Sequence, residues 1–235
     1  MMFSFVFERL KKRGAPSAHH VAGAPQVRSY QTMLGKHLPP AAQQPTLELL
    51  ALAPEVRLTV SRPRKTKLGD YRPPRPHSGG AHHITINSDL NRYAFLVTLL
   101  HEIAHYHTFV RHGNVPAHGT AWKNQFRALL QPFLTPEMFP SDVLLALQKY
   151  AKNIKASSCT DQNLLRSLNA HNPKSELGSH LKTVESLPQN ALFMAQNGKI
   201  YMKKEKIRTR FLCIEQKTHQ KATVHPLMLI TEVQK

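Results

Sequence analysis

The chain has 235 residues, of which 41% are hydrophobic, so it can form one domain of ordinary size with a core, together with a smaller second unit. No apolar run approaches the roughly eighteen residues of a membrane-spanning helix, and the two cysteines, Cys159 and Cys213, exclude a disulfide framework and a four-cysteine zinc site. A formal net charge of +18 indicates an anionic partner, nucleic acid before anionic lipid, with a merely solvated cationic surface as the alternative.

The first residues show no export signal. The apolar start, residues 1–7, is too short for a secretory signal and no positive charge precedes it, so we expect a cytoplasmic protein. Residues 14–26 are small, proline-containing and aperiodic, and the segment 1–26 is predicted to be a disordered leader.

Two short helices and a group of strands are predicted next. The helices are expected at residues 27–35 and 46–53. The hydrophobic period then changes to two, which is typical of strands, and we expect these at residues 56–60, 68–72 and around 84–86. Residues 73–81 are rich in proline and glycine and are predicted to form a loop.

A buried helix is predicted to begin near Leu90, with Ser88 or Asp89 as its N-cap, and to run to about residue 110; its apolar run begins at Tyr93. Thr98 alone interrupts the apolar residues of its first half, and a helix that is apolar on all sides is a buried one. Three more helices are expected, beginning at Gly119, at Pro140 or Ser141, and after an N-cap at Thr160.

The C-terminal part returns to a period of two. Asn197-Gly198 lies between two alternating runs, which is the strongest short signal for a β-hairpin, and further strands are expected at residues 206–214 and 222–231. The predicted organisation is a leader at 1–26, a main domain at 27–169, a polar linker at 170–190 and an antiparallel β unit at 191–235.

The buried helix carries two histidines and a glutamate at a spacing that metal sites use. His101 and His105 are four residues apart and therefore project from one face of the helix. Two imidazoles in this arrangement can bind one metal ion at about 2.0–2.1 Å. Glu102 can act as a general base on a water molecule held by that ion. A carboxylate in a buried helix is costly unless it is paired or belongs to a site.

A catalytic zinc site takes three protein ligands and leaves one position open. His107, His112 and His118 are the candidates for the third ligand. His107 points away from the first pair, whereas His112 could fold back toward it. His118 is favoured, because the intervening residues let the chain turn round and because Trp122 and Phe126 would anchor the next helix against the first.

These motifs resemble the SprT-like metallopeptidase-type family, in its bacterial branch. The most specific match is His101-Glu102-x-x-His105 followed by His118-Gly119-x-x-Trp122-Lys123, and the similarity covers about residues 43–168. The resemblance implies an α+β fold with a zincin-like core, in which helices pack on a small antiparallel sheet. It also implies one zinc ion on the three histidines, with Glu102 as the catalytic acid and base.

The resemblance further implies a role with DNA, because eukaryotic relatives of the Spartan type are DNA-dependent proteases that act on protein crosslinked to DNA. Many relatives also carry a C-terminal zinc ribbon with two Cys-x-x-Cys pairs, whereas this chain has Cys213 alone in that region. We therefore expect the C-terminal unit to resemble a zinc ribbon without its metal, and both cysteines to be packing residues.

The leading hypothesis is metal-assisted hydrolysis of a protein substrate that is attached to DNA. The substrate would add to a sheet edge at residues 56–60 or 84–87. Two groups of basic residues are candidates for nucleic-acid binding. They are Arg62, Arg64, Lys65 and Lys67 beside the catalytic sheet, and Lys204, Lys206, Arg208 and Arg210, which would form one row on an extended strand. A solvated edge strand would also use lysine in this way.

Two other functions remain open at this point. A nucleic-acid-binding regulator could keep zinc for structure and cut nothing, although such a protein has no need of Glu102. A general cytosolic aminopeptidase or endopeptidase would cut free peptides and be indifferent to DNA.

Overall fold

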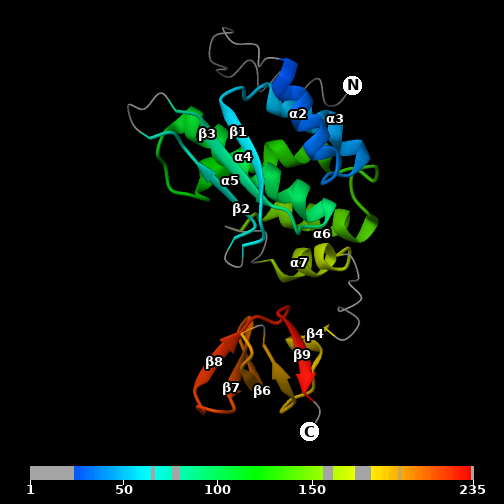
Figure 1. The fold of residues 1–235 in the computed structure, drawn as a ribbon, viewed down its shortest axis with the longest axis vertical. Helices are drawn as coiled ribbons and strands as arrows, with labels where there is room; N and C mark the ends of the chain where they lie inside the picture. The colour runs from blue at the N-terminus through cyan, green and yellow to red at the C-terminus, as the bar shows by residue number, and fades with distance from the viewer. Residues whose placement is uncertain are drawn as a thin grey trace. The chain divides into compact units, whose positions relative to one another are not determined.

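The computed structural model describes residues 24–64, 67–75, 80–155, 161–172, 181–195 and 197–233. The chain divides into two compact units, residues 1–172 and 173–235, and each is described by itself (Figure 1). Among the described residues, no helix combines the length and apolar character needed to cross a membrane.

The first unit consists of helices and a three-stranded sheet. Its elements are α2 (Ala24–Gly35), α3 (Pro40–Ala51), β1 (Val56–Ser61), β2 (Gly69–Arg72), β3 (His82–Asn87), α4 (Arg92–His112), α5 (Thr120–Leu130), a 3-10 turn (Gln131–Phe133), α6 (Ser141–Lys152) and α7 (Gln162–Asn169). Helix α2 begins inside the predicted leader, of which residues 1–23 lie outside the described residues, as do Lys65, Cys159 and Thr160.

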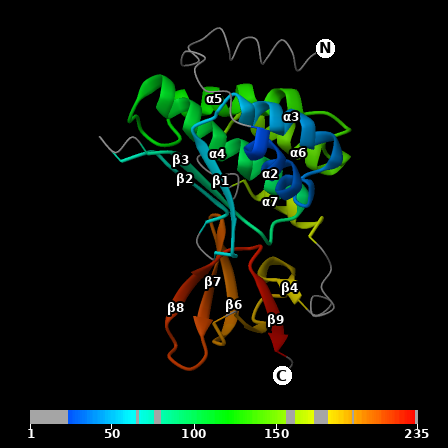
Figure 2. The same cartoon turned by 45° about the horizontal axis from the view of Figure 1, so that its top comes forward.

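The sheet of the first unit has the order β1-β3-β2. β2 and β3 are antiparallel, but β1 and β3 are parallel, so the prediction of a purely antiparallel sheet is wrong. Alternation along a strand predicts which face is buried, not the direction of its neighbour. Val56, Leu58, Ile84 and Ile86 are all buried, and the helices gather on the face of the sheet that these side chains cover (Figure 2).

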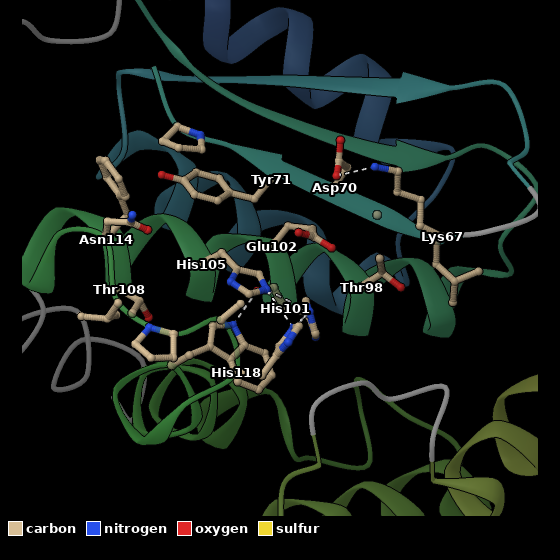
Figure 3. Close-up of a pocket in the computed structure, with 18 of the residues that line it drawn as sticks. Lys67, Asp70, Tyr71, Thr98, His101, Glu102, His105, Thr108, Asn114 and His118 are labelled. Atoms are coloured by element: carbon tan, nitrogen blue, oxygen red, sulfur yellow. Dashed lines mark hydrogen bonds and ion pairs between the residues drawn. The ribbon is translucent and has the colours of Figure 1, made fainter. Parts of the chain in front are cut away.

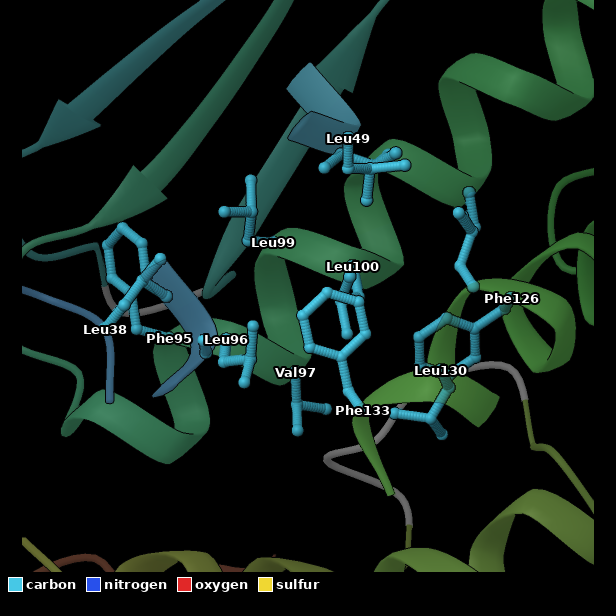
Figure 4. Packing of buried hydrophobic residues seen from close by; sticks show 14 of the residues in the cluster. Leu38, Leu49, Phe95, Leu96, Val97, Leu99, Leu100, Phe126, Leu130 and Phe133 are labelled. Atoms are coloured by element: carbon cyan, nitrogen blue, oxygen red, sulfur yellow. The ribbon is translucent and has the colours of Figure 1, made fainter. Parts of the chain in front are cut away.

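Helix α4 is the centre of the core, as its all-round apolar sequence predicts. Figure 4 shows Leu38 and Leu49 approaching it from one side and Phe126 and Leu130 from another, and all four are buried. Since an isolated helix gains little from propensity alone, this burial is what stabilises α4.

The N-cap of α4 is Asn91, not Ser88 or Asp89 as predicted. Its side-chain oxygen accepts from the N–H groups of Tyr93 and Ala94, and its amide nitrogen donates to the Leu168 carbonyl at 2.8 Å. An aspartate would accept the first two bonds but could not donate the third. Asn91 therefore joins the start of α4 to the end of α7.

The second unit is a six-stranded sheet with the order β4-β9-β5-β6-β7-β8, in which every paired neighbour is antiparallel. Its elements are β4 (Leu181–Thr183), a 3-10 turn (Val184–Ser186), β5 (Leu192–Met194), β6 (Ile200–Ile207), β7 (Arg210–Glu215), β8 (Lys221–Val224) and β9 (Leu229–Val233). The hairpin at Asn197-Gly198 is confirmed, with Gly198 at a φ of 76° between β5 and β6. β4 lies inside the predicted linker, so part of that segment is folded.

Lys203 is a buried cation in the second unit. Lys203 is 5% exposed, and its Nζ donates to the carbonyl oxygens of Glu185 and Leu187. The same Nζ lies 4.1 Å from the centre of the Phe211 ring, a cation–π arrangement. Cys213, the cross-strand neighbour of Lys203, is fully buried and free.

Candidate metal centre

Three histidine side chains from the first unit meet at one point (Figure 3). Nε2 of His105 lies 3.2 Å from Nε2 of His101 and 3.1 Å from Nε2 of His118, and the other two Nε2 atoms are 3.1 Å apart. Three atoms cannot alternate as donor and acceptor around a triangle, so hydrogen bonding does not account for this arrangement. Nitrogen ligands at 2.0–2.1 Å from a tetrahedral zinc ion would lie ~3.3 Å apart. The three histidines, called the histidine site below, therefore fit one metal ion.

Two elements supply these side chains. His101 and His105 lie one turn apart on α4, which ends at His112, and the backbone N–H of the following Gly113 donates to the Phe109 carbonyl. His118 comes from the loop at 113–119 and has a φ of 59°. Residues other than glycine rarely adopt this left-handed conformation, which costs about 1–2 kcal/mol. Such strain is characteristic of functional positions, and here it accompanies the placement of a candidate ligand.

Trp122 and Phe126 hold α5 against the histidine site. Both are fully buried. The Trp122 ring centre lies 4.6 Å from the ring centres of His101 and His118, and its Nε1 donates to the His101 carbonyl at 3.4 Å. The predicted anchoring of the second helix against the first is confirmed.

Burial keeps the site histidines neutral. It lowers the pKa of His105 to about 4, with a further contribution from the neighbouring His118. Burial also holds the pKa of His101 well below its usual range and lowers that of His118. A neutral imidazole is the form that binds a metal, so none of the three has to lose a proton at neutral pH.

Glu102 is 6% exposed and lines the same cavity as the three histidines. Burial raises its pKa to about 8, and the nearby Asp70 carboxylate adds to this rise. Arg64, Lys67 and the backbone N–H of Tyr71 oppose it by favouring the charged form. A carboxyl group with a pKa near neutral can both accept and release a proton.

Strand β2 borders the cavity, a role that sequence reasoning missed. A Cβ atom at Gly69 would lie 2.5 Å from Oε1 of Glu102 and 2.7 Å from Cγ2 of Thr98, so only glycine lets β2 come this close to α4. The signal was a glycine inside a predicted strand, which often marks the close approach of another element. The cavity between β2, α4 and the 113–119 loop has a volume of about 650 Å³.

The other two candidate ligands lie away from this point. His112 is exposed at the end of α4. His107 is 9% exposed and its Nε2 has no hydrogen-bond partner, so it is a core residue that points away from the first pair, as predicted. Across the described residues, His101, His105 and His118 are the one group spaced to hold a metal ion.

Two of the basic residues near the sheet, Arg64 and Lys67, are bonded to other side chains of the protein. Arg64 Nε donates to Asn87 Oδ1 at 2.8 Å and its Nη1 to Thr85 Oγ1 at 3.0 Å, so it braces β3. Lys67 Nζ lies 2.7 Å from Asp70 Oδ1 and lines the cavity. Arg62 is exposed.

The predicted basic row in the second unit is wrong, because the chain turns within it. β6 ends at Ile207, Arg208 has a φ of 53°, and β7 begins at Arg210. Lys206 pairs with Phe211 and Ile207 with Arg210, with an irregularity in β6 between Lys203 and Lys206. The four basic residues Lys204, Lys206, Arg208 and Arg210 therefore gather around the β6–β7 hairpin and do not follow one face. The turn carries neither glycine nor asparagine, which hid it from sequence analysis.

Comparison with known proteins gives one finding. No curated protein and no solved structure matches the chain. The model of the SprT-like family matches residues 42–139, a span that includes β1 to β3, α4, the 113–119 loop and α5. The matched span thus holds the whole histidine site together with Glu102, and it is this part of the chain that is similar to the SprT-like family.

Proposed function

We propose that this chain is a zinc-dependent peptidase that acts on DNA-associated proteins in the cytoplasm. The observation that carries the proposal is the placement of Glu102 in the same cavity as the convergent Nε2 atoms of His101, His105 and His118. A structural zinc site is closed by four ligands, whereas three histidines and a neighbouring carboxyl group are typical of a hydrolytic site.

Each residue has a role in this proposal. The three histidines hold the zinc ion, which when bound lowers the pKa of its water to about 7 and polarises a carbonyl group. Glu102 accepts a proton from the attacking water and donates it to the leaving amine. Burial raises the pKa of Glu102, which makes its carboxylate a stronger proton acceptor than an exposed one.

The substrate backbone would add to β2. One edge of β2 pairs with β3, and β2 itself lines the cavity, so a peptide added to its other edge would pass the histidine site. The edges expected from the sequence do not meet this condition. β3 is the central strand, and β1 lies on its far side.

The proposed role with DNA is supported by the net charge of +18 and by the basic residues of the β6–β7 hairpin. Lys206, Arg208 and Arg210 are exposed, as phosphate contacts require. The single buried thiol among the described residues, Cys213, is free, which suits the reducing cytoplasm.

The Glu102→Gln variant tests the catalytic part. It keeps a polar side chain of the same size but cannot transfer the proton, so cleavage of a protein substrate should fall at least a hundredfold (about 10²–10⁴ for loss of a general base). Zinc content should stay near one ion per chain. Undiminished cleavage by this variant would rule out the proposed mechanism.

Single-stranded DNA tests the second part. The purified chain should cleave a DNA-bound protein faster than the same protein free in solution. On single strands, each phosphate contact adds about 0.7 to the slope of log affinity against log salt. Replacing Lys206, Arg208 and Arg210 with serine should flatten that slope, whereas replacing the exposed Lys149 and Lys152 of α6 should leave it unchanged or nearly so.

A non-catalytic zinc-containing regulator is the second candidate. It predicts that Glu102→Gln keeps its zinc and also keeps full function in cells. A general peptidase predicts instead that DNA changes neither the rate nor the choice of substrate.

A further inference from the structure

The cavity has two ends of different chemistry, with the histidine site between them (Figure 3). Tyr71 and Asn114 lie toward one end, and Lys67 and Asp70 lie toward the other. A peptide lying along β2 would place one side chain toward each end.

The first end is enclosed by rings. Tyr71 lies parallel to the His105 ring, with 6.2 Å between the centres and 5° between the planes. Phe109 lies 6.4 Å from Tyr71 at a tilt of 57°. Val115 and Pro116, from the 113–119 loop, line the cavity as well. These four residues are called the apolar end.

The hydroxyl groups at the apolar end are already bonded within the protein. The Tyr71 hydroxyl lies 2.8 Å from Nδ1 of His82, and Thr108 Oγ1 donates to the Ala104 carbonyl at 2.7 Å. Neither hydroxyl needs a partner from a substrate, so apart from the Asn114 amide, which also lines the cavity, this end presents carbon surface. Polar groups of a substrate would lose water there without regaining hydrogen bonds.

The opposite end carries an excess of positive charge. Asp70 is bonded at 2.7 Å by both Lys67 Nζ and Arg72 Nε, so two cations share one carboxylate. The side chains of Lys67 and Arg72 are 42% and 71% exposed, and Lys67 itself lines the cavity. This charged end can attract an acidic group, and repels a basic one.

We propose that the cleft selects peptides with a bulky apolar side chain on one side of the scissile bond and an acidic side chain on the other. The inference rests on the proposed peptidase function and names its substrate class. The apolar end supplies the first preference through Phe109 and Tyr71, and the charged end supplies the second through Lys67.

Binding to the zinc-loaded Glu102→Gln protein tests this preference without turnover. Fluorescent peptides of one length would differ at the two central positions: leucine or serine at one, and aspartate, asparagine or lysine at the other. Fluorescence anisotropy should show the leucine–aspartate pair binding at least tenfold more tightly than the serine–aspartate pair, since an apolar contact of this size is worth about 10–200-fold. Aspartate should also bind more tightly than asparagine, and lysine most weakly.

Second substitutions in that protein assign the two preferences. Phe109→Ser or Val115→Ser should abolish the preference for leucine over serine, and Lys67→Ala should abolish the preference for aspartate over asparagine while leaving the first intact. Leu145→Ser is the matched control, because Leu145 is 58% exposed on α6 and does not line the cavity. Circular dichroism and zinc content would verify that each variant is folded and loaded.

Equal binding of all peptides would overturn the inference, and so would a leucine preference that survives both apolar-end substitutions. A different result would contradict the peptidase proposal alone. In that case the peptides would still bind selectively, but the protein with intact Glu102 would release no products from the preferred peptide.

Discussion

Gly69 on β2 and Glu102 on α4 lie so close that a methyl group at position 69 would overlap the Glu102 carboxyl group, at 2.5 Å from Oε1. Gly69→Ala should therefore displace Glu102 and lower kcat/KM on the order of a hundredfold, as misplacement of a catalytic group by about 1 Å can do. Zinc content should not change, since no histidine is touched. Gly35→Ala is the control, because a Cβ there meets nothing closer than 3.9 Å. Normal activity in Gly69→Ala would show that Glu102 has room to move.

Removal of the loop ligand should weaken metal binding. His118→Ala leaves two histidines on α4, so zinc should be lost to a competing chelator at concentrations at least tenfold lower than for the unaltered protein. His112→Ala is the matched control, since the exposed His112 is the other histidine near the end of α4. Equal zinc retention in the two variants would mean that His118 is not a ligand.

The stability of the metal-free protein should fall in acid. Burial lowers the folded-state pKa of His105 to about 4, whereas the unfolded value is near 6.5. Between these values the unfolded chain binds more protons, so stability must decrease as the pH falls from about 6.5 to about 4. His105 alone would contribute on the order of 3 kcal/mol.

Urea denaturation at several pH values would measure this dependence. Burial also lowers the pKa of His82 and His107, which add a slope of the same sign. The comparison is therefore with a variant that has glutamine at all three site positions. Its slope should be smaller, and identical slopes would contradict the lowered pKa values of the histidine site.

Asn91 should be needed in both of its roles. Asn91→Ala removes the N-cap of α4 and the bond to the Leu168 carbonyl, and should lower the free energy of unfolding by about 2 kcal/mol. Asn91→Asp keeps the cap and should recover part of that loss, as measured by urea denaturation. If aspartate were no better than alanine, the cap itself would contribute little.

Lys203 should stabilise the second unit. Lys203→Met leaves the carbonyls of Glu185 and Leu187 without this donor and should cost about 2 kcal/mol. The single tryptophan, Trp122, lies in the first unit, so its fluorescence reports that unit alone. The β-sheet signal in circular dichroism should be lost at lower denaturant, while the Trp122 transition stays in place. Lys204→Met, at a partly exposed neighbouring position, should change neither.

Local patterns predicted the helix that carries the site. The spacing of His101 and His105 follows from helix geometry, and the burial of α4 follows from its composition, so both could be inferred without knowing the fold. His118 could be predicted as the third ligand because few histidines follow the helix and because the chain between His105 and His118 is short.

Long-range relations could not be inferred in this way. The sequence of residues 68–72 does not predict the contact between Gly69 and Glu102. That contact depends on the pairing of β2 with β3 and on the packing of both strands against α4. The parallel pairing of β1 with β3 is hidden for the same reason. The turn at Arg208 was missed because the left-handed backbone conformation there is adopted by an arginine, whereas sequence analysis looks for glycine or asparagine at such positions.

The loop at 113–119 carries both His118, a candidate ligand, and two residues of the apolar end, Val115 and Pro116. A metal ion and a bound side chain would therefore hold the same seven residues in place. Thermodynamic linkage makes such an effect reciprocal: if zinc tightens peptide binding by some factor, the preferred peptide must tighten zinc binding by the same factor. In this protein, peptide affinity and zinc affinity would then both depend on one conformational equilibrium, that of the 113–119 loop.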